Sequence, residues 1–264
     1  MRKIKKKIVI LGSKPDAIIP TASVYVCANY SAYYYKDQLT DFNNSKIYTI
    51  LSASEVLTGL RADAEHKDAW IVSRLANLQD GGIGQTFIYN SEFYPNSTSV
   101  ISSLNLNKKP VYLPYQLVLD IQKKLLNKTE PFITIKHVDL NLRYMVHLAR
   151  AYFRDIFSKM FSSELVNYSG LFRPSTGVFA LLYAIHLFGK DAEYILAGIG
   201  LTGRGLYPDN KDNNWTSQMG LDKKHTLVDR YIITLLSLSK IYDISTTEDD
   251  LNGILKQFKE RASF

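Results

Sequence analysis

Apolar residues along the chain fall into short β-branched runs and longer stretches with helical spacing. Short runs bounded by polar or turn residues are typical of buried strands. The expected strands are Ile8–Leu11, Val24–Ala28, Ile47–Ile50, Thr86–Tyr89, Ile133–Ile135 and Tyr194–Ala197. The expected helices are Leu113–Leu126, Leu142–Met160, Thr176–Leu187, Thr226–Ser239 and Glu248–Glu260. This alternation predicts an α/β fold, in which crossover helices flank a central, mostly parallel sheet.

The organisation of the chain indicates one domain. Its 264 residues, 46% of them hydrophobic, can bury a large core. Because no repeat, low-complexity segment or change of composition marks a second unit, residues 1–264 are expected to form a single domain. Residues 53–115 have the weakest pattern, with loop residues at Gly81–Gly84 and Asn96–Ser99, and are expected to form a lid-like or acceptor-facing insertion. Residues 248–264 are expected to form a C-terminal amphipathic helix.

Charge and cysteine content limit the classes of partner. The chain has 32 basic and 25 acidic residues, a net charge of +7, and basic clusters near both ends. No helix carries a continuous basic stripe, so we expect no nucleic-acid partner. Cys27 is the only cysteine and Ile8–Leu11 is too short for a signal peptide or membrane span, which indicates a cytoplasmic protein. The basic clusters and the C-terminal helix leave peripheral contact with the inner face of a membrane as an alternative to plain solvated surface.

A turn followed by an apolar helix carries the first candidate chemistry. In Arg173-Pro174-Ser175-Thr176-Gly177 the proline ends the preceding segment, and Ser175 or Thr176 can cap the helix that follows. Hydroxyls and free N–H groups then face one point, where the helix dipole favours an anion. About fifty residues later His225 begins a second helix, with Asp229 one turn further along the same face. An anion site together with a candidate base indicates group transfer.

The N-terminal strands predict a second part of the site. Gly12, Ser13 and Lys14 follow the first expected strand, and Asn29 follows the second. In open α/β sheets ligands bind beyond the carboxyl ends of the strands, which is where these residues fall. No Asp-x-Asp follows a strand, and the other histidines lack ligand spacing, so we expect neither a metal ion nor another cofactor.

These residues, in this order and separation, resemble the sialyl motifs of sialyltransferases. Arg173–Gly177 is similar to the Pro-Ser/Thr-Ser/Thr-Gly turn that touches the nucleotide in the animal enzymes, and to Arg-x-Thr-Ser-Gly in bacterial ones. His225–Asp229 is similar to a His-x-x-x-Glu whose histidine is the catalytic base. Lys7–Asp16 looks like their first strand and Gly-x-Gly-Pro-Ser turn, and Val24–Tyr30 like their second strand, which ends in Arg-Cys-Asn. The resemblance covers most of the chain and implies a Rossmann-like domain of a variant glycosyltransferase-A type.

Three departures bring the chain nearer to the bacterial enzymes, or to a sister family with a related donor. Asp229 replaces the Glu of the animal motif. The single Cys27 cannot form the disulfide that joins the animal motifs. Ser13 and Lys14 stand where the bacterial enzymes usually have Asn and Gly.

The resemblance implies an inverting, metal-independent transferase. Its donor would be a cytidine monophosphate (CMP) ester of sialic acid or a related nonulosonic acid, and its acceptor a hydroxyl of a cell-surface glycan or lipid-linked oligosaccharide. His225 would take the proton of the acceptor hydroxyl, and Asp229 would orient the imidazole. Arg173 would pair with the sugar carboxylate or with a neighbouring acid, and Tyr207 would lie near the leaving phosphate. The residues expected to hold the nucleotide are Gly12, Ser13, Lys14, Asn29, Arg173, Ser175, Thr176, Gly177 and Tyr207.

Two alternatives remain open at this point. The donor could be another CMP-activated keto-acid, notably Kdo in lipopolysaccharide or capsule synthesis, because the same phosphate cradle and base would serve. The chain could also be a non-catalytic glycan-assembly protein that retains the fold. Retention of both His225 and the hydroxyl-rich turn favours an enzyme, since a binding module needs no base.

Overall fold

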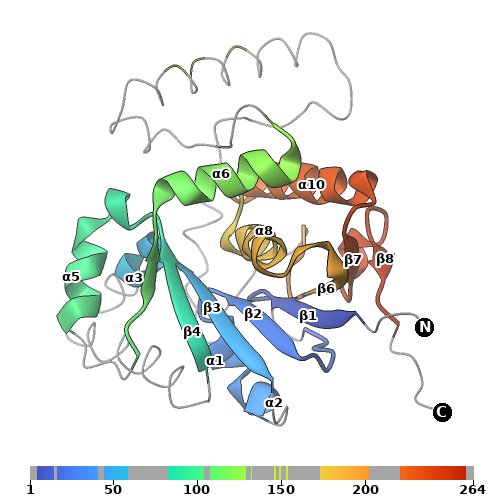
Figure 1. Cartoon of the computed structure of the whole chain (residues 1–264), viewed down its shortest axis with the longest axis horizontal. Helices are drawn as coiled ribbons and strands as arrows, with labels where there is room; N and C mark the ends of the chain where they lie inside the picture. The colour runs from blue at the N-terminus through green and yellow to red at the C-terminus, as the bar shows by residue number, and fades with distance from the viewer. Residues whose placement is uncertain are drawn as a thin grey trace.

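An eight-stranded parallel sheet forms the centre of the molecule (Figure 1). The computed structural model describes residues 5–14, 17–40, 45–58, 83–103, 108–128, 132, 146, 149, 153, 173–201 and 221–259. The strands are β1 (Lys6–Leu11), β2 (Val24–Ala28), β3 (Lys46–Ser52), β4 (Ile83–Tyr89), β5 (Val111–Leu113), β6 (Ala192–Ala197), β7 (Asp243–Thr246) and β8 (Lys256–Gln257). Their order is β5-β4-β3-β2-β1-β6-β7-β8. The predicted α/β, Rossmann-like fold is confirmed.

Strand side chains alternate between two apolar cores, one on each face of the sheet. In β1, Ile8 and Ile10 belong to one core while Val9 and Leu11 belong to the other, and all four are fully buried. Burial on both faces explains why these strands read as continuous apolar runs in the sequence. The helices of the first core are α6 (Tyr115–Leu126), α8 (Thr176–Phe188) and α10 (Leu221–Ser239). Those of the second are α1 (Ser31–Tyr34), α2 (Lys36–Thr40), α3 (Ala53–Thr58) and α5 (Pro95–Ser103).

Helix α8 is the central helix of the first core. It packs on β1, β2 and β3 and is covered on its other side by α6 and α10 (Figure 1). An apolar sequence on every side of the helix suits this position, and each residue from Val178 to Ile185 is buried. The helix begins at Ser175, at the carboxyl edge of the sheet, because α8 runs antiparallel to the strand β6 that follows it.

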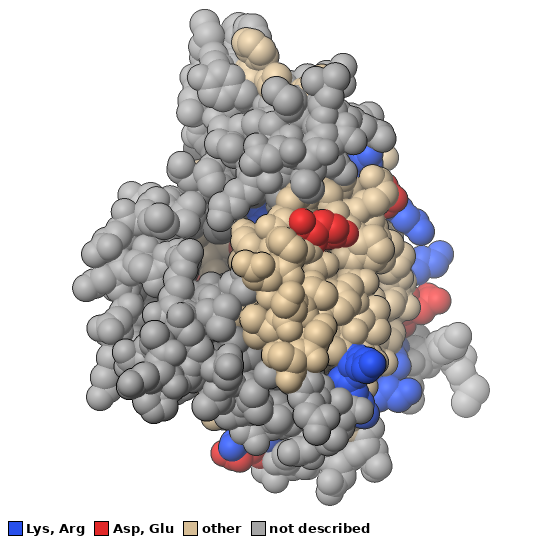
Figure 2. All heavy atoms as spheres, turned by 90° about the vertical axis from the view of Figure 1, so that its left-hand side faces the viewer, with Lys and Arg blue, Asp and Glu red and all other residues tan. Residues whose placement is uncertain are grey.

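The described residues on the side of the molecule that carries α5, at the left of Figure 1, include few charged side chains. The sequence of α5 contains only Pro, Asn, Ser, Thr, Val and Ile. Figure 2 shows few charged side chains across the middle of the described surface on this side, and more of them toward its margin. On the described part of this face, the charged side chains therefore lie mainly toward the margin.

The strand order reverses between β1 and β6. From β1 the chain adds β2 to β5 on one side of the sheet and then returns to add β6, β7 and β8 on the other. Ligands in open α/β sheets bind at such a switch point, outside the carboxyl ends of the strands. Gly12 and Gly198, the residues that follow β1 and β6, stand at this position.

Residues 53–115 were expected to form a lid-like insertion, and this expectation is wrong for the described part of the segment. It contributes β4 and β5 to the sheet, and α3 and α5 to the second core. The β-branched and aromatic residues of Thr86–Tyr89 are a strand signal, but β5 has only three residues and leaves almost no pattern. Residues 59–82 lie outside the described residues.

The expected helix over residues 248–264 is also incorrect for the described residues, which end at 259. A short 3₁₀ helix, η6 (Asp249–Leu251), is followed by a turn and by β8, which pairs in parallel with β7. Asn252 and Gly253 are poor helix formers, and the edge of β7 offers backbone partners to the residues that follow. Leu251 and Leu255 still reach the core, so burial does not require the helix. Other 3₁₀ helices are η2 (Ser91–Phe93) and η5 (Gly189–Asp191).

Candidate functional site

Ser175 caps the N-terminus of α8 as the sequence predicts. Its backbone is extended, with φ −61° and ψ 162°, and its Oγ accepts a hydrogen bond from the Val178 N–H at 3.3 Å. The carbonyl of Ser175 accepts from the Phe179 N–H at 2.9 Å and begins the intrahelical series. The first-turn N–H groups of Thr176 and Gly177 come too early in the helix for an intrahelical acceptor. They remain as donors at the positive end of the helix dipole.

Asp229 joins the two sequence motifs in space. Its Oδ1 accepts a hydrogen bond at 2.9 Å from the N–H of Ser175, 54 residues away in the chain. The side chain is only 7% exposed, and burial raises the pKa of Asp229 from 3.8 to about 7, against the opposing effect of hydrogen bonds from Ser175. Asp229 therefore ties α10 to the start of α8. The role expected from the sequence, orientation of His225, remains a prediction, because His225 lies in α10 but its side chain is outside the described residues.

Arg173 and Tyr89 extend the site toward β3 and β4. The Tyr89 hydroxyl lies 2.9 Å from Thr176 Oγ1, and it accepts a hydrogen bond at 3.1 Å from the Arg173 guanidinium. The same guanidinium donates to the hydroxyls of Ser52 and Ser54 at 3.4 and 3.5 Å. A cation and four hydroxyls thus converge at the carboxyl edge of β3 and β4, beside the start of α8.

The loops after β1 and β6 meet at the switch point. A Cβ on Gly12 would lie 2.1 Å from the carbonyl oxygen of Gly198, so only glycine allows the two backbones to approach this closely. Glu248, which is 5% exposed, accepts from the Gly198 N–H at 2.7 Å through Oε1 and pairs with Lys14 Nζ at 2.5 Å through Oε2. The hydrogen bond with Glu248 raises the pKa of Lys14. A protein carboxylate therefore occupies the place where a ligand anion would be expected at this crevice.

Ile199 lies between the two halves of the predicted site. Cβ positions built on Gly12 and on Gly177 would come within 2.6 and 3.3 Å of its side chain. Gly12 and the start of α8 therefore face one another across a single isoleucine. Ser13 and Lys14 continue from Gly12, but Lys14 engages Glu248 rather than α8.

Two asparagines that directly follow strands of the sheet share one backbone conformation. Asn29, after β2, and Asn90, after β4, have φ of 51° and 64°. Asparagine is among the residues that adopt this left-handed region most readily. The side-chain oxygen of each is buried and has no hydrogen-bond partner within the described part of the chain. Asn29 was predicted from the sequence, whereas Asn90 was not.

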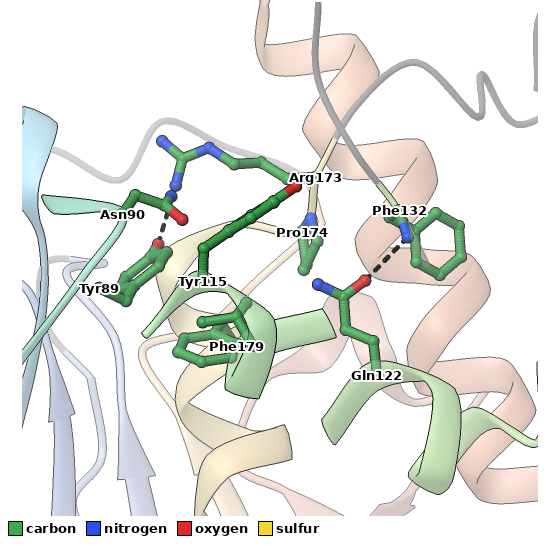
Figure 3. Close-up of a pocket in the computed structure, with 9 residues that line it drawn as sticks. Tyr89, Asn90, Tyr115, Gln122, Phe132, Arg173, Pro174 and Phe179 are labelled. Atoms are coloured by element: carbon green, nitrogen blue, oxygen red, sulfur yellow. Dashed lines mark hydrogen bonds between the residues drawn. The ribbon is translucent and has the colours of Figure 1, made fainter. Parts of the chain in front are cut away.

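A pocket opens between β4, α6 and the start of α8 (Figure 3). Its empty volume is about 240 Å³, part of which is open to solvent. Aromatic and aliphatic side chains form most of the wall, with Arg173, Asn90 and Gln122 as polar members. The lining residues are Tyr89, Asn90, Tyr115, Val118, Gln122, Phe132, Arg173, Pro174 and Phe179.

The structure brings together about half of the predicted nucleotide-binding residues. Arg173, Ser175, Thr176 and Gly177 form one group with Asp229, while Gly12, Ser13 and Lys14 form another at the switch point, and Asn29 lies after β2. Tyr207 lies outside the described residues. Sequence reasoning missed Tyr89, Asn90 and Glu248. Asn90 is a polar residue directly after a strand, which was a signal that the sequence offered. Glu248 lies in an acidic run that resembles exposed surface, so no signal in the sequence indicated that its carboxylate is buried.

No family model, curated protein or solved structure matches the chain. Among the described residues, no group of three or more His, Cys, Asp or Glu side chains is arranged to hold a metal ion. In the same residues, no helix is both long and apolar enough to cross a membrane.

Proposed function

We propose that the protein is an inverting glycosyltransferase that moves sialic acid or a related nonulosonic acid from a CMP-activated donor to a hydroxyl of a glycan acceptor. The observation that carries the proposal is the 2.9 Å hydrogen bond between Asp229 Oδ1 and the Ser175 N–H. It joins the helix that bears the candidate base to the helix end that would bind the donor phosphate. A base and an anion site must be adjacent for transfer away from a phosphate leaving group.

The start of α8 supports a phosphate site in three ways. The N–H groups of Thr176 and Gly177 and the helix dipole favour an anion there. Arg173 adds a positive charge through its contact with Tyr89, whose hydroxyl also meets Thr176. Because burial raises the pKa of Asp229 to about 7, its carboxyl is mostly neutral below that pH and does not oppose a bound phosphate. These donors and this charge suit a single phosphate group, such as that of a nucleoside monophosphate ester.

The reaction would need one base and no redox step. His225, one helical turn before Asp229 in α10, would accept the proton of the acceptor hydroxyl. The acceptor oxygen would bond to the anomeric carbon as the bond from that carbon to the phosphate oxygen breaks, and CMP would leave with the electron pair. Arg173 and the donors at the start of α8 would stabilise the charge that develops on the phosphate.

A nucleotide panel tests the donor assignment. Thermal unfolding is measured with CMP, UMP, AMP, GMP and a uridine diphosphate sugar, and ligand at a hundred times its dissociation constant should stabilise the fold by about 2.7 kcal/mol. We expect CMP to bind most tightly, Thr176→Val to weaken that binding, and Thr234→Val to leave it unchanged, since the half-buried Thr234 hydroxyl bonds only the Arg230 carbonyl of its own helix among the described residues. Stronger stabilisation by a uridine diphosphate sugar would refute the proposal.

A further inference from the structure

The side-chain oxygen of Asn90, at the edge of the pocket, accepts no hydrogen bond from the described residues. Asn90 is 1% exposed, and its Oδ1 has no hydrogen-bond partner in the described part of the chain. A buried acceptor without a donor is costly, so native proteins rarely retain one unless a ligand or water completes it. Figure 3 shows Asn90 on the β4 side of the pocket, beside Tyr89 and Arg173. A hydrogen-bond donor on a group that enters the pocket would complete this acceptor.

The rest of the wall selects what carries that donor. Tyr115, Val118, Phe132 and Phe179 are between 1% and 6% exposed and are predominantly apolar. A group that fills this space gains from burial of carbon, whereas an ion would lose its hydration against aromatic rings. The ligand group is therefore small, neutral and partly apolar, with an N–H or O–H directed at Asn90.

We propose that this pocket binds the N-acyl amino group of a substrate sugar, with the amide N–H donating to Asn90 Oδ1 and the short acyl chain lying against Phe179 and Tyr115. A secondary amide is planar, neutral and carries one N–H beside a methyl-sized apolar end, which meets each requirement of the wall. A bare hydroxyl would satisfy Asn90 but leave the aromatic wall without a partner. The assignment of this group to a substrate sugar rests on the proposed glycosyltransferase function.

The N-acyl group could belong to the donor or to the acceptor, and matched ligand pairs separate these sources. The donor pair is CMP-N-acetylneuraminic acid and its analogue with a hydroxyl in place of the acetamido group. The acceptor pair is the methyl glycoside of N-acetylgalactosamine and that of galactose. Affinities are measured by calorimetry or by NMR with the full chain. We expect one pair to show about tenfold tighter binding of the N-acetylated member, from one hydrogen bond and one buried methyl group.

Variants at Asn90 test its role without straining the backbone. Asn90→Gly keeps the left-handed conformation and removes the acceptor, so the preference should fall to less than about twofold. Asn90→Asp keeps an acceptor oxygen and should retain the preference. Asn127→Gly is the matched control, because Asn127 is also left-handed, with φ 48°, but is exposed at the end of α6.

The outcomes separate the pocket from the proposed function. Equal affinities within both pairs, or a preference that survives Asn90→Gly, would overturn the pocket assignment. If the CMP ligands bind without an N-acetyl preference in either pair, the pocket assignment fails while the donor assignment stands. If no CMP ligand binds but N-acetylgalactosamine is preferred through Asn90, the proposed function fails and the pocket assignment stands.

Discussion

Asp229→Asn should remove a large pH dependence of stability. Burial raises the pKa of the carboxyl from 3.8 in the unfolded chain to about 7 in the folded protein. Between these values the native carboxyl keeps its proton while the unfolded chain has lost it. The free energy of unfolding therefore falls as pH rises, by up to about 1.4 kcal/mol per pH unit, and the loss levels off above about pH 7.

The variant replaces the carboxyl with a group that does not titrate. The Asn amide oxygen can still accept from the Ser175 N–H, so the tie between α10 and α8 is kept. In the wild type, the native carboxyl must either keep its proton or become a buried charge as pH rises, and both lower the free energy of unfolding. The variant has no such group, so its stability relative to the wild type should increase with pH. From pH 5 to pH 7 this gain should be about 2 kcal/mol.

Urea unfolding at several pH values between 5 and 8, followed by circular dichroism, measures the difference directly. Asp120→Asn is the control, since Asp120 lies exposed on α6 and its substitution should give a difference that is flat with pH. A flat difference for Asp229→Asn as well would refute the inference that Asp229 is protonated in the native state near neutral pH. It would also remove the argument that a neutral Asp229 tolerates a phosphate at the start of α8.

The remaining predictions concern glycine contacts, the buried carboxylate and the helix cap. Gly12→Ala should cost about 3 kcal/mol in urea unfolding, because its Cβ would meet the Gly198 carbonyl, whereas Gly253→Ala, with no atom within 4 Å, should change stability by less than about 0.5 kcal/mol. Glu248→Ala should cost about 3 kcal/mol and Glu248→Gln clearly less, since Gln still accepts from Gly198. Ser175→Ala should lower stability by about 1 kcal/mol through loss of the cap and leave CMP affinity near wild type, as calorimetry would check.

Sequence patterns predicted the parts of the fold whose residues are buried on every side. Val24–Ala28 and Val178–Ile185 are apolar throughout because each lies between two packed layers, and both elements form as expected. Edge elements left weaker signals. β8 has two residues, and its pairing with β7 depends on a neighbour that the local sequence does not specify. The apolar residues of this C-terminal segment have helical spacing, which explains why a helix was expected over residues 248–264.

The candidate site was predictable only where one segment carries the chemistry. The cap of α8 follows from local residue types, and Ser175 fulfils it. The partner of Asp229 did not follow, because helical spacing points toward His225 whereas the buried contact is with Ser175, far away in the chain. Tyr89 and Glu248 acquire their roles from tertiary contacts with Thr176 and Gly198. Such roles depend on strand order, which single-residue patterns do not contain.

Turnover with and without the candidate base tests the central claim most directly. Release of CMP from CMP-sialic acid and from CMP-Kdo is measured in the presence of glycan acceptors, with wild type and with His225→Ala. We predict acceptor-dependent CMP release by the wild type and a loss of at least a hundredfold in kcat and kcat/KM in the variant, with CMP affinity within about twofold. Wild-type turnover that His225→Ala retains, or the absence of CMP release from both donors, would contradict the account.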